Sequence, residues 1–239
     1  MIIIGHRGAR GEAPENTLSS FQYIHDLGIR AVEFDVRQLK DGELVIMHDD
    51  NFLRTTAIDK NLYECASTEL APYNQAHIWM DWDQQMTPTL RQGLNIMHDF
   101  NHLEVEVKAV ESMAEAEKLA AELQKQLQGF QHTAVITSFD IKIHHALQQQ
   151  KSDFKRGLLI EEDVKFKAID QALELGCCQI GWMNQLATLD IIQATQRAKL
   201  DISVWTVNDL QRAITLQDLG VNGLITDFPK LMMQHLNLP

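Results

Sequence analysis

Cysteine is scarce in this chain. Only Cys65, Cys177 and Cys178 occur among 239 residues, so their number is odd and two of them are neighbours. An odd, adjacent set does not make a disulfide framework, and it lacks the CxxC spacing of a zinc site. We therefore expect buried, unreactive thiols and a reducing compartment.

Long apolar runs and basic clusters are also missing. No uninterrupted apolar stretch approaches the roughly 18 residues of a membrane span, and the opening run Met1–Gly5 is too short for a signal peptide. The formal net charge is −12, with no run of Lys or Arg. Such an acidic surface argues against a nucleic-acid partner. Because neither a signal peptide nor a membrane span is expected, the expected location is the cytoplasm.

What the chain does contain is a regular alternation of short β-type runs and longer helical patterns. The predicted strands are Ile2–Ile4, Arg30–Asp35, Leu103–Val107, Ala134–Thr137, Arg156–Leu159, Cys178–Gly181, Ile202–Trp205 and Gly223–Thr226. The predicted helices are Thr17–Leu27, Leu90–Phe100, Met113–Leu127, Ile141–Gln149, Val164–Leu175, Leu186–Ala198, Leu210–Leu219 and Lys230–His235. This alternation predicts parallel strands with right-handed crossovers.

Eight strands with eight helices favour a closed (β/α)8 TIM barrel, although an open doubly wound sheet alternates in the same way. One connection breaks the rhythm, because residues 49–86 form a long polar stretch. A loop of that length is usually functional or folds into a small unit. We predict one domain over residues 1–239, with an insertion after the second strand at roughly 49–86.

Two predicted strands carry paired acids. Glu33 and Asp35 alternate with apolar residues on the second strand, so both point to the same side. Two carboxylates on one face repel each other unless a cation lies between them. Oxygen ligands favour Mg²⁺ or Ca²⁺, with Mn²⁺ as a third candidate.

The third predicted strand repeats this pattern with Glu104, Glu106 and Lys108 on one face. Unpaired charges are strongly disfavoured in an ordinary core. This face therefore predicts a polar site, in which Glu106 supplies a further metal ligand and Lys108 faces an anion.

Two histidines follow β-type runs. His6 and Arg7 lie between Gly5 and Gly8 at the end of the first strand, where Arg7 has the geometry to bind a phosphate. His48 follows the run 44–47. Each pattern is weak when taken alone.

Taken together, these segments resemble the glycerophosphodiester phosphodiesterase family. The matching segments occur in the family's order and include the stretches His6–Gly8, Pro14–Thr17, Glu33–Val36, Asp41–Gly42, His48–Asp49, Arg54–Thr56, Pro88–Leu90, Glu106–Lys108, Ser138–Phe139, Trp205–Asn208 and Gly223–Pro229.

The resemblance implies a TIM barrel that hydrolyses glycerophosphodiesters, a small-molecule substrate, to sn-glycerol 3-phosphate and an alcohol. It implies a divalent cation on Glu33, Asp35 and Glu106. It also implies that His6 and His48 act as general acid and base, without saying which is which. Arg7 and Lys108 would then neutralise phosphate charge, and Trp205 would be either a wall for the glycerol or a packing residue.

Two positions depart from the family pattern. Glu104 stands where an amide is usual, and Arg91 where an acid is usual. These departures leave metal preference and substrate detail open. The other readings are a metal-dependent amidohydrolase, a phosphodiesterase acting on lysophospholipids or sphingomyelin-like lipids, and a non-catalytic phosphate-binding barrel. Oligomeric state, head group, and attack by water or by a neighbouring hydroxyl also stay open.

Overall fold

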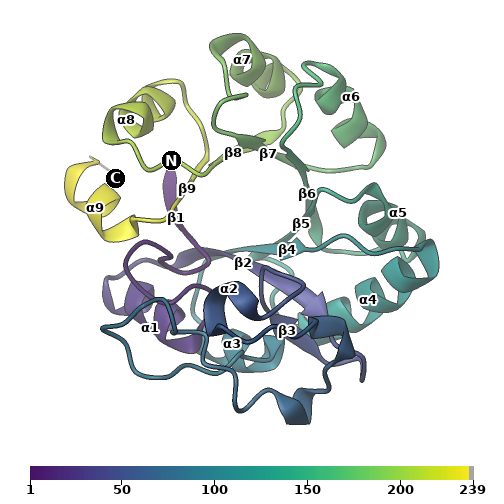
Figure 1. Cartoon of the computed structure of the whole chain (residues 1–239). Helices are drawn as coiled ribbons and strands as arrows, with labels where there is room; N and C mark the ends of the chain where they lie inside the picture. Colours follow the sequence, from purple (N-terminus) through teal and green to yellow (C-terminus); the bar gives the residue numbers. More distant parts are fainter. Residues whose placement is uncertain (237–239) are drawn as a thin grey trace.

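The computed structural model describes residues 1–236, in which parallel strands close into a ring (Figure 1). The strands of the ring are β1 (Ile2–His6), β2 (Ala31–Gln38), β4 (His102–Val107), β5 (Ala134–Ser138), β6 (Lys155–Ile160), β7 (Gln179–Met183), β8 (Asp201–Trp205) and β9 (Gly223–Thr226). Each strand pairs with the next, and β1 pairs with both β9 and β2. The predicted TIM barrel is confirmed, and the open sheet is excluded.

Helices surround the ring on the outside (Figure 1). They are α1 (Leu18–Asp26), α2 (Leu53–Thr56), α3 (Leu90–Ile96), α4 (Met113–Gln126), α5 (Ile141–Gln149), α6 (Lys167–Glu174), α7 (Leu189–Arg197), α8 (Leu210–Asp218) and α9 (Pro229–His235). All eight predicted strands and all eight predicted helices are present, with small shifts at their ends. The short elements α2 and β3 (Leu44–Ile46) were not predicted.

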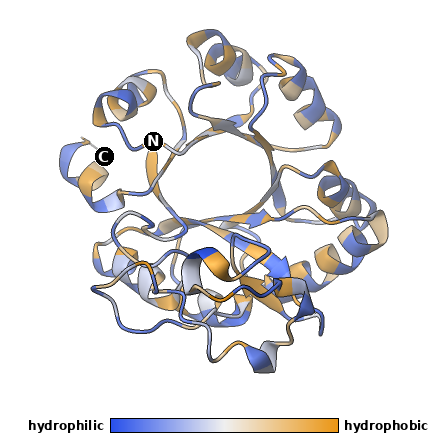
Figure 2. Ribbon diagram, viewed as in Figure 1, coloured by the Kyte–Doolittle hydropathy of each residue, from blue (hydrophilic) through white to orange (hydrophobic). Residues whose placement is uncertain are grey.

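Local sequence explains why these elements pack as they do. In β4, Leu103, Val105 and Val107 are buried in the main hydrophobic core, whereas the residues between them face the barrel interior. Ser112 caps the start of helix α4, because its side chain accepts a hydrogen bond from the backbone N–H of Glu115. In Figure 2 the ring of strands is mostly orange, whereas the surrounding helices alternate between orange and blue.

The long connection after β2 has a small core of its own. Strand β3 pairs antiparallel with β2, and the chain then continues through α2 and two short 3₁₀ turns, Leu62–Glu64 and Ser67–Glu69. Phe52 stacks on Tyr73, with 4.3 Å between the ring centroids. Phe52 belongs to the small core of the insertion, and Tyr73 packs against that core. The insertion lies beside the mouth of the barrel on the β2–β3 side (Figure 1).

Among residues 1–236, none of the helices combines the length and the apolar character that crossing a membrane would require. All three cysteines are free thiols. Cys65 and Cys177 are buried as predicted, but the prediction is wrong for Cys178, which is partly exposed. It directly precedes β7, and its backbone N–H donates to the Arg156 carbonyl at 2.9 Å.

Candidate active site

The carboxyl ends of β1, β2 and β4 bring most of the predicted site residues together. Strand register places His6 beside Glu33, and Asp35 beside Glu106. Neighbouring parallel strands end at the same rim of the barrel, where active sites of this fold are built. The alternation seen in the sequence thus becomes one polar surface.

Three carboxylates form the centre of that surface. Each of Glu33, Asp35 and Glu106 offers one oxygen, these oxygens all lie within 4.8 Å of one another, and all three residues are buried. Glu33 Oε1 has no hydrogen-bond partner among residues 1–236. A buried, unpartnered carboxylate oxygen within an all-oxygen set fits a hard divalent cation such as Mg²⁺ or Ca²⁺. The predicted ligand residues therefore do converge.

The pKa values of the three acids reflect their burial and the charges around them. Burial, followed by the charges of Asp35 and Glu106, raises the pKa of Glu33 well above its usual range. Burial also raises the pKa of Glu106. For Asp35, burial is outweighed by the charges of Lys108 and Arg7, which lower its pKa. A cation at this position would offset the burial and the repulsion that raise the pKa values of Glu33 and Glu106.

Two cations already face the carboxylates. Lys108 Nζ lies 2.6 Å from Asp35 Oδ1 and also contacts Glu106. Arg7 Nε lies 3.2 Å from Asp35 Oδ2, and the backbone N–H of Arg7 donates to Glu33 Oε2 at 3.1 Å. The Asn16 side-chain amide also donates to Asp35 Oδ2, at 2.7 Å. Asp35 is therefore held in place from three directions.

A tight turn after β1 points Arg7 toward this group. Arg7 has a φ of 52° and Gly8 a φ of 87°, both in the left-handed region. A Cβ on Gly8 would lie 2.1 Å from Ser20 Oγ. Only glycine fits this position, both for its backbone angle and for the close approach of α1.

His6 is buried and paired with an aspartate from the far end of the chain. Its Nδ1 donates to Asp227 Oδ1 at 2.6 Å, and Asn208 donates to the other oxygen of Asp227 at 2.7 Å. Its Nε2 lies 3.9 Å from Glu33 Oε2. Because a carboxylate only accepts, the proton is on Nδ1 and neutral His6 presents a bare Nε2 to the site. Burial lowers the pKa of His6, and the hydrogen bond to Asp227 partly offsets this.

His48 has the same kind of partner, supplied by the next residue. Its Nδ1 donates to Asp49 Oδ1 at 2.7 Å, and Arg54 Nε donates to Asp49 Oδ2 at 2.6 Å. The arginine lowers the cost of ionising Asp49. Although burial opposes this, hydrogen bonds from His48 and Arg54 lower the pKa of Asp49. The sequence interpretation assigned no role to Asp49 or Arg54, although both lie within segments that match the family.

Two cavities adjoin the carboxylates. A wide one of about 850 Å³ opens beside His48, Glu106 and Lys108. A small one of about 20 Å³ is lined by His6, Glu33 and Trp205. The Trp205 indole donates to the Gly181 carbonyl at 3.0 Å, so this residue packs at the rim of the barrel and also lines the cavity.

The two departures from the family pattern lie in different places: Glu104 is the register partner of Glu33 and lines the small cavity, whereas Arg91 is on helix α3. Glu104 accepts from His102 at 3.2 Å and from Ser203 at 3.2 Å, deeper in the barrel. It is not among the three acids that converge. Arg91 is exposed near the start of α3, and its charge acts on Glu122 of α4.

Comparison with known proteins agrees with this geometry. Residues 6–231 match the Glycerophosphoryl diester phosphodiesterase family. The chain belongs to this family. Its members are phosphoric diester hydrolases, so the chain is an enzyme of that class.

Two relatives span the whole barrel, and a third matches part of it. The glycerophosphodiester phosphodiesterase of Caldanaerobacter subterraneus is 26% identical over 242 residues, which cover 97% of this chain and 96% of the relative. A phosphodiesterase of Oleispira antarctica, solved with its product sn-glycerol-3-phosphate, superposes with a TM-score of 0.90 at 24% identity, covering 100% of this chain and 97% of that structure. A human lysophospholipase D is 39% identical over 70 residues, 29% of this chain and 22% of the relative.

Proposed function

We propose that the chain hydrolyses glycerophosphodiesters to sn-glycerol 3-phosphate and an alcohol, with one divalent cation and with His6 and His48 as acid–base pair. One observation carries the proposal: three buried carboxylates converge within 4.8 Å at the rim of the barrel. The product bound to the Oleispira relative supports the choice of substrate.

Glu33, Asp35 and Glu106 would hold the cation. When bound, the cation would polarise the phosphoryl group and lower the pKa of the attacking hydroxyl. The same carboxylates keep Lys108 and Arg7 in place, and these two cations neutralise charge that develops on the phosphate oxygens.

The two histidines would move the protons. Each holds its Nδ1 proton against an aspartate, His6 on Asp227 and His48 on Asp49, so each presents Nε2 to the substrate. One imidazole, neutral, takes the proton of the attacking hydroxyl on its Nε2, and the other, protonated on both ring nitrogens, gives its Nε2 proton to the departing alcohol. We further propose a reducing compartment such as the cytoplasm, because the three cysteines are unpaired.

The first test is release of sn-glycerol 3-phosphate from glycerophosphocholine and glycerophosphoethanolamine. We expect EDTA to abolish turnover, and Mg²⁺, Ca²⁺ or Mn²⁺ to restore it. Following the reaction by phosphorus NMR shows whether a cyclic phosphate precedes the final product. Turnover that is fully resistant to chelators would contradict the proposed metal site.

A second candidate substrate is a lysophospholipid, which the match to a human lysophospholipase D favours. The same assay with lysophosphatidylcholine distinguishes the two substrates. Faster turnover of the acylated substrate would favour this candidate, whereas a clear preference for the deacylated diester supports the main proposal.

A further inference from the structure

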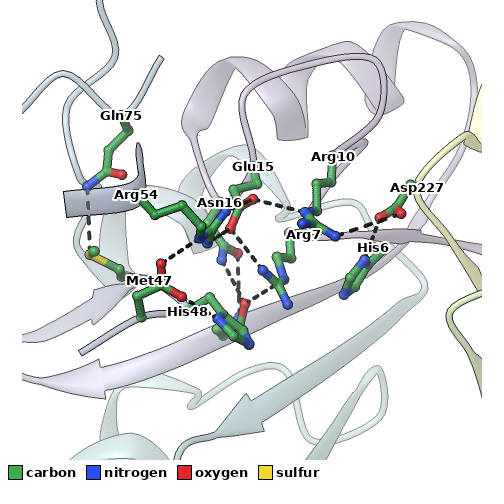
Figure 3. A network of polar contacts seen from close by, with 12 residues as sticks. His6, Arg7, Arg10, Glu15, Asn16, Met47, His48, Arg54, Gln75 and Asp227 are labelled. Atoms are coloured by element: carbon green, nitrogen blue, oxygen red, sulfur yellow. Dashed lines mark hydrogen bonds and ion pairs between the residues drawn. The ribbon is translucent and has the colours of Figure 1, made fainter. Parts of the chain in front are cut away.

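Behind the two histidines lies a buried carboxylate that three arginines share. The Glu15 side chain is 3% exposed, and it accepts hydrogen bonds from Arg7 at 2.9 Å, from Arg10 at 3.1 Å and from Arg54 at 2.6 and 2.8 Å (Figure 3). Although burial opposes ionisation, Arg54 and Arg7 lower the pKa of Glu15 to about 2. Glu15 is therefore a permanent anion next to the site.

Arg54 donates two hydrogen bonds to Glu15, whereas Arg7 and Arg10 donate one each. Both of its terminal nitrogens donate to Glu15, and its Nε donates to Asp49 at 2.6 Å. One planar guanidinium thus joins two carboxylates, a fork geometry that lysine does not reproduce. Arg54 comes from α2 in the insertion, whereas Glu15 comes from the loop after β1.

The contacts continue to His48. Asp49 uses one oxygen for Arg54 and the other for His48 Nδ1 at 2.7 Å. The side chains of His48 and Asp49 are 35% and 23% exposed, so the surrounding protein covers them only partly. Asp49 therefore depends on Arg54 to keep its carboxylate directed at the imidazole.

His6 is supported differently. Its partner Asp227 accepts from Asn208 at 2.7 Å, whereas Arg10 Nη1 lies 3.9 Å from Asp227. The Arg10 side chain is 41% exposed, and it donates to Glu15 as Arg54 does. Arg10 thus offers a matched control, because it shares the bond to Glu15 but does not contact Asp49.

We propose that Arg54 is a positioning residue that, anchored on buried Glu15, orients Asp49 and through it the imidazole of His48. This inference rests on the proposed role of His48 in catalysis. It assigns the insertion a role in the reaction, because Arg54 reaches the site only if the insertion is folded against the β1 loop.

The test compares Arg54→Gln with Arg10→Gln on glycerophosphocholine with saturating Mg²⁺. We expect Arg54→Gln to lower kcat by about 10–100-fold, as loss of an orienting partner does, with little change in KM. Arg10→Gln should lose less than about threefold, as for an exposed ion pair. Equal losses in the two variants would overturn the proposal.

A double-mutant cycle tests whether Arg54 acts through Asp49. The Arg54→Gln/Asp49→Asn double variant should be no slower than Asp49→Asn alone, because both changes break one chain of contacts. Losses that multiply would contradict the inference. If Arg54→Gln does not fold, Arg54→Lys replaces it, with the same kcat loss expected and a wild-type kcat counting against the proposal.

A readout without turnover separates this inference from the proposed function. Nitrogen chemical shifts of the His48 ring should show the proton on Nδ1 in wild type and a mixture of tautomers in Arg54→Gln. An unchanged His48 signal overturns the inference even if the enzyme is active. A wild-type protein that turns over no diester contradicts the proposed function, whatever the spectra show.

Discussion

The two sides of the site present the same pair of groups by different means. On one side, His6 lies at the end of β1 and its partner Asp227 follows β9, 221 residues later. On the other side, His48 and Asp49 are neighbours in the chain, and His48 lines the wide cavity. The His6 side is buried, with side-chain exposures of 10% and 13%, whereas the His48 side is 35% and 23% exposed.

This difference shows where each side obtains its rigidity. Closure of the barrel pairs β1 with β9 and brings Asp227 against His6, so the His6 side is held by the sheet itself. The His48 side is held by a loop contact, because Arg54 and Glu15 fix Asp49 from behind (Figure 3). The buried side is preorganised by the fold, and the exposed side depends on the insertion.

The largest effect is expected from removing either imidazole. His6→Ala and His48→Ala should each lower kcat by about 10²–10⁴-fold, the usual contribution of a general acid or base. Comparing the kcat of each variant on a choline diester and on a p-nitrophenyl diester distinguishes the general acid from the general base. The variant that recovers on the better leaving group has lost the general acid. Near-normal kcat in both variants, with the fold intact by circular dichroism, would remove the histidines from the mechanism.

A third histidine, His144, can be compared with His6 and His48, because its Nε2 is hydrogen-bonded to a backbone carbonyl and not to a carboxylate. His144 is buried and its Nε2 pairs with the Ser138 carbonyl at 3.1 Å; burial lowers its pKa to about 4. The unfolded chain takes up this proton near pH 6.5, so stability falls as the pH drops from 6.5 toward 4. The loss from this group is roughly 3 kcal/mol across that window.

Urea unfolding at several pH values measures this loss. In His144→Gln the free energy of unfolding should fall less steeply over the same pH range, because the titrating group is gone. An identical pH slope in the wild type and the variant would show that His144 is not the residue responsible.

The two aspartates should differ from each other. Asp227→Asn and Asp49→Asn should each lower kcat by about 10–100-fold, because each histidine loses the partner that fixes its tautomer. The loss should be larger for Asp227, since its hydrogen bond lies in the more buried environment, where the local dielectric is lower. Steady-state kinetics of the two variants at one pH gives the ratio. A larger loss at Asp49 would reverse this ranking of the two sides.

The smallest effect is expected deeper in the barrel. Glu104→Gln removes the charge at the position that departs from the family pattern, but its partners are His102 and Ser203. We expect a stability loss of about 1 kcal/mol and an unchanged metal concentration at half-maximal activity. A shifted metal titration would bring Glu104 into the metal site.

Much of this protein could be predicted from its sequence alone. Apolar alternation and helical spacing predicted the strands and helices, because both depend on local backbone geometry. The same alternation placed Glu33 with Asp35, and Glu104 with Glu106, on one side of their strands. The order of the motifs, from His6 to Pro229, predicted the family.

Only the tertiary structure decided how the site is supported. The pairing of His6 with Asp227 needs the barrel to close, and the sharing of Glu15 by three arginines needs the insertion to fold against the β1 loop. Glu104 belongs with His102 and Ser203 because it lies lower in the barrel than Glu106, which alternation alone does not reveal. Contacts of this kind join residues far apart in the chain, so no local pattern encodes them.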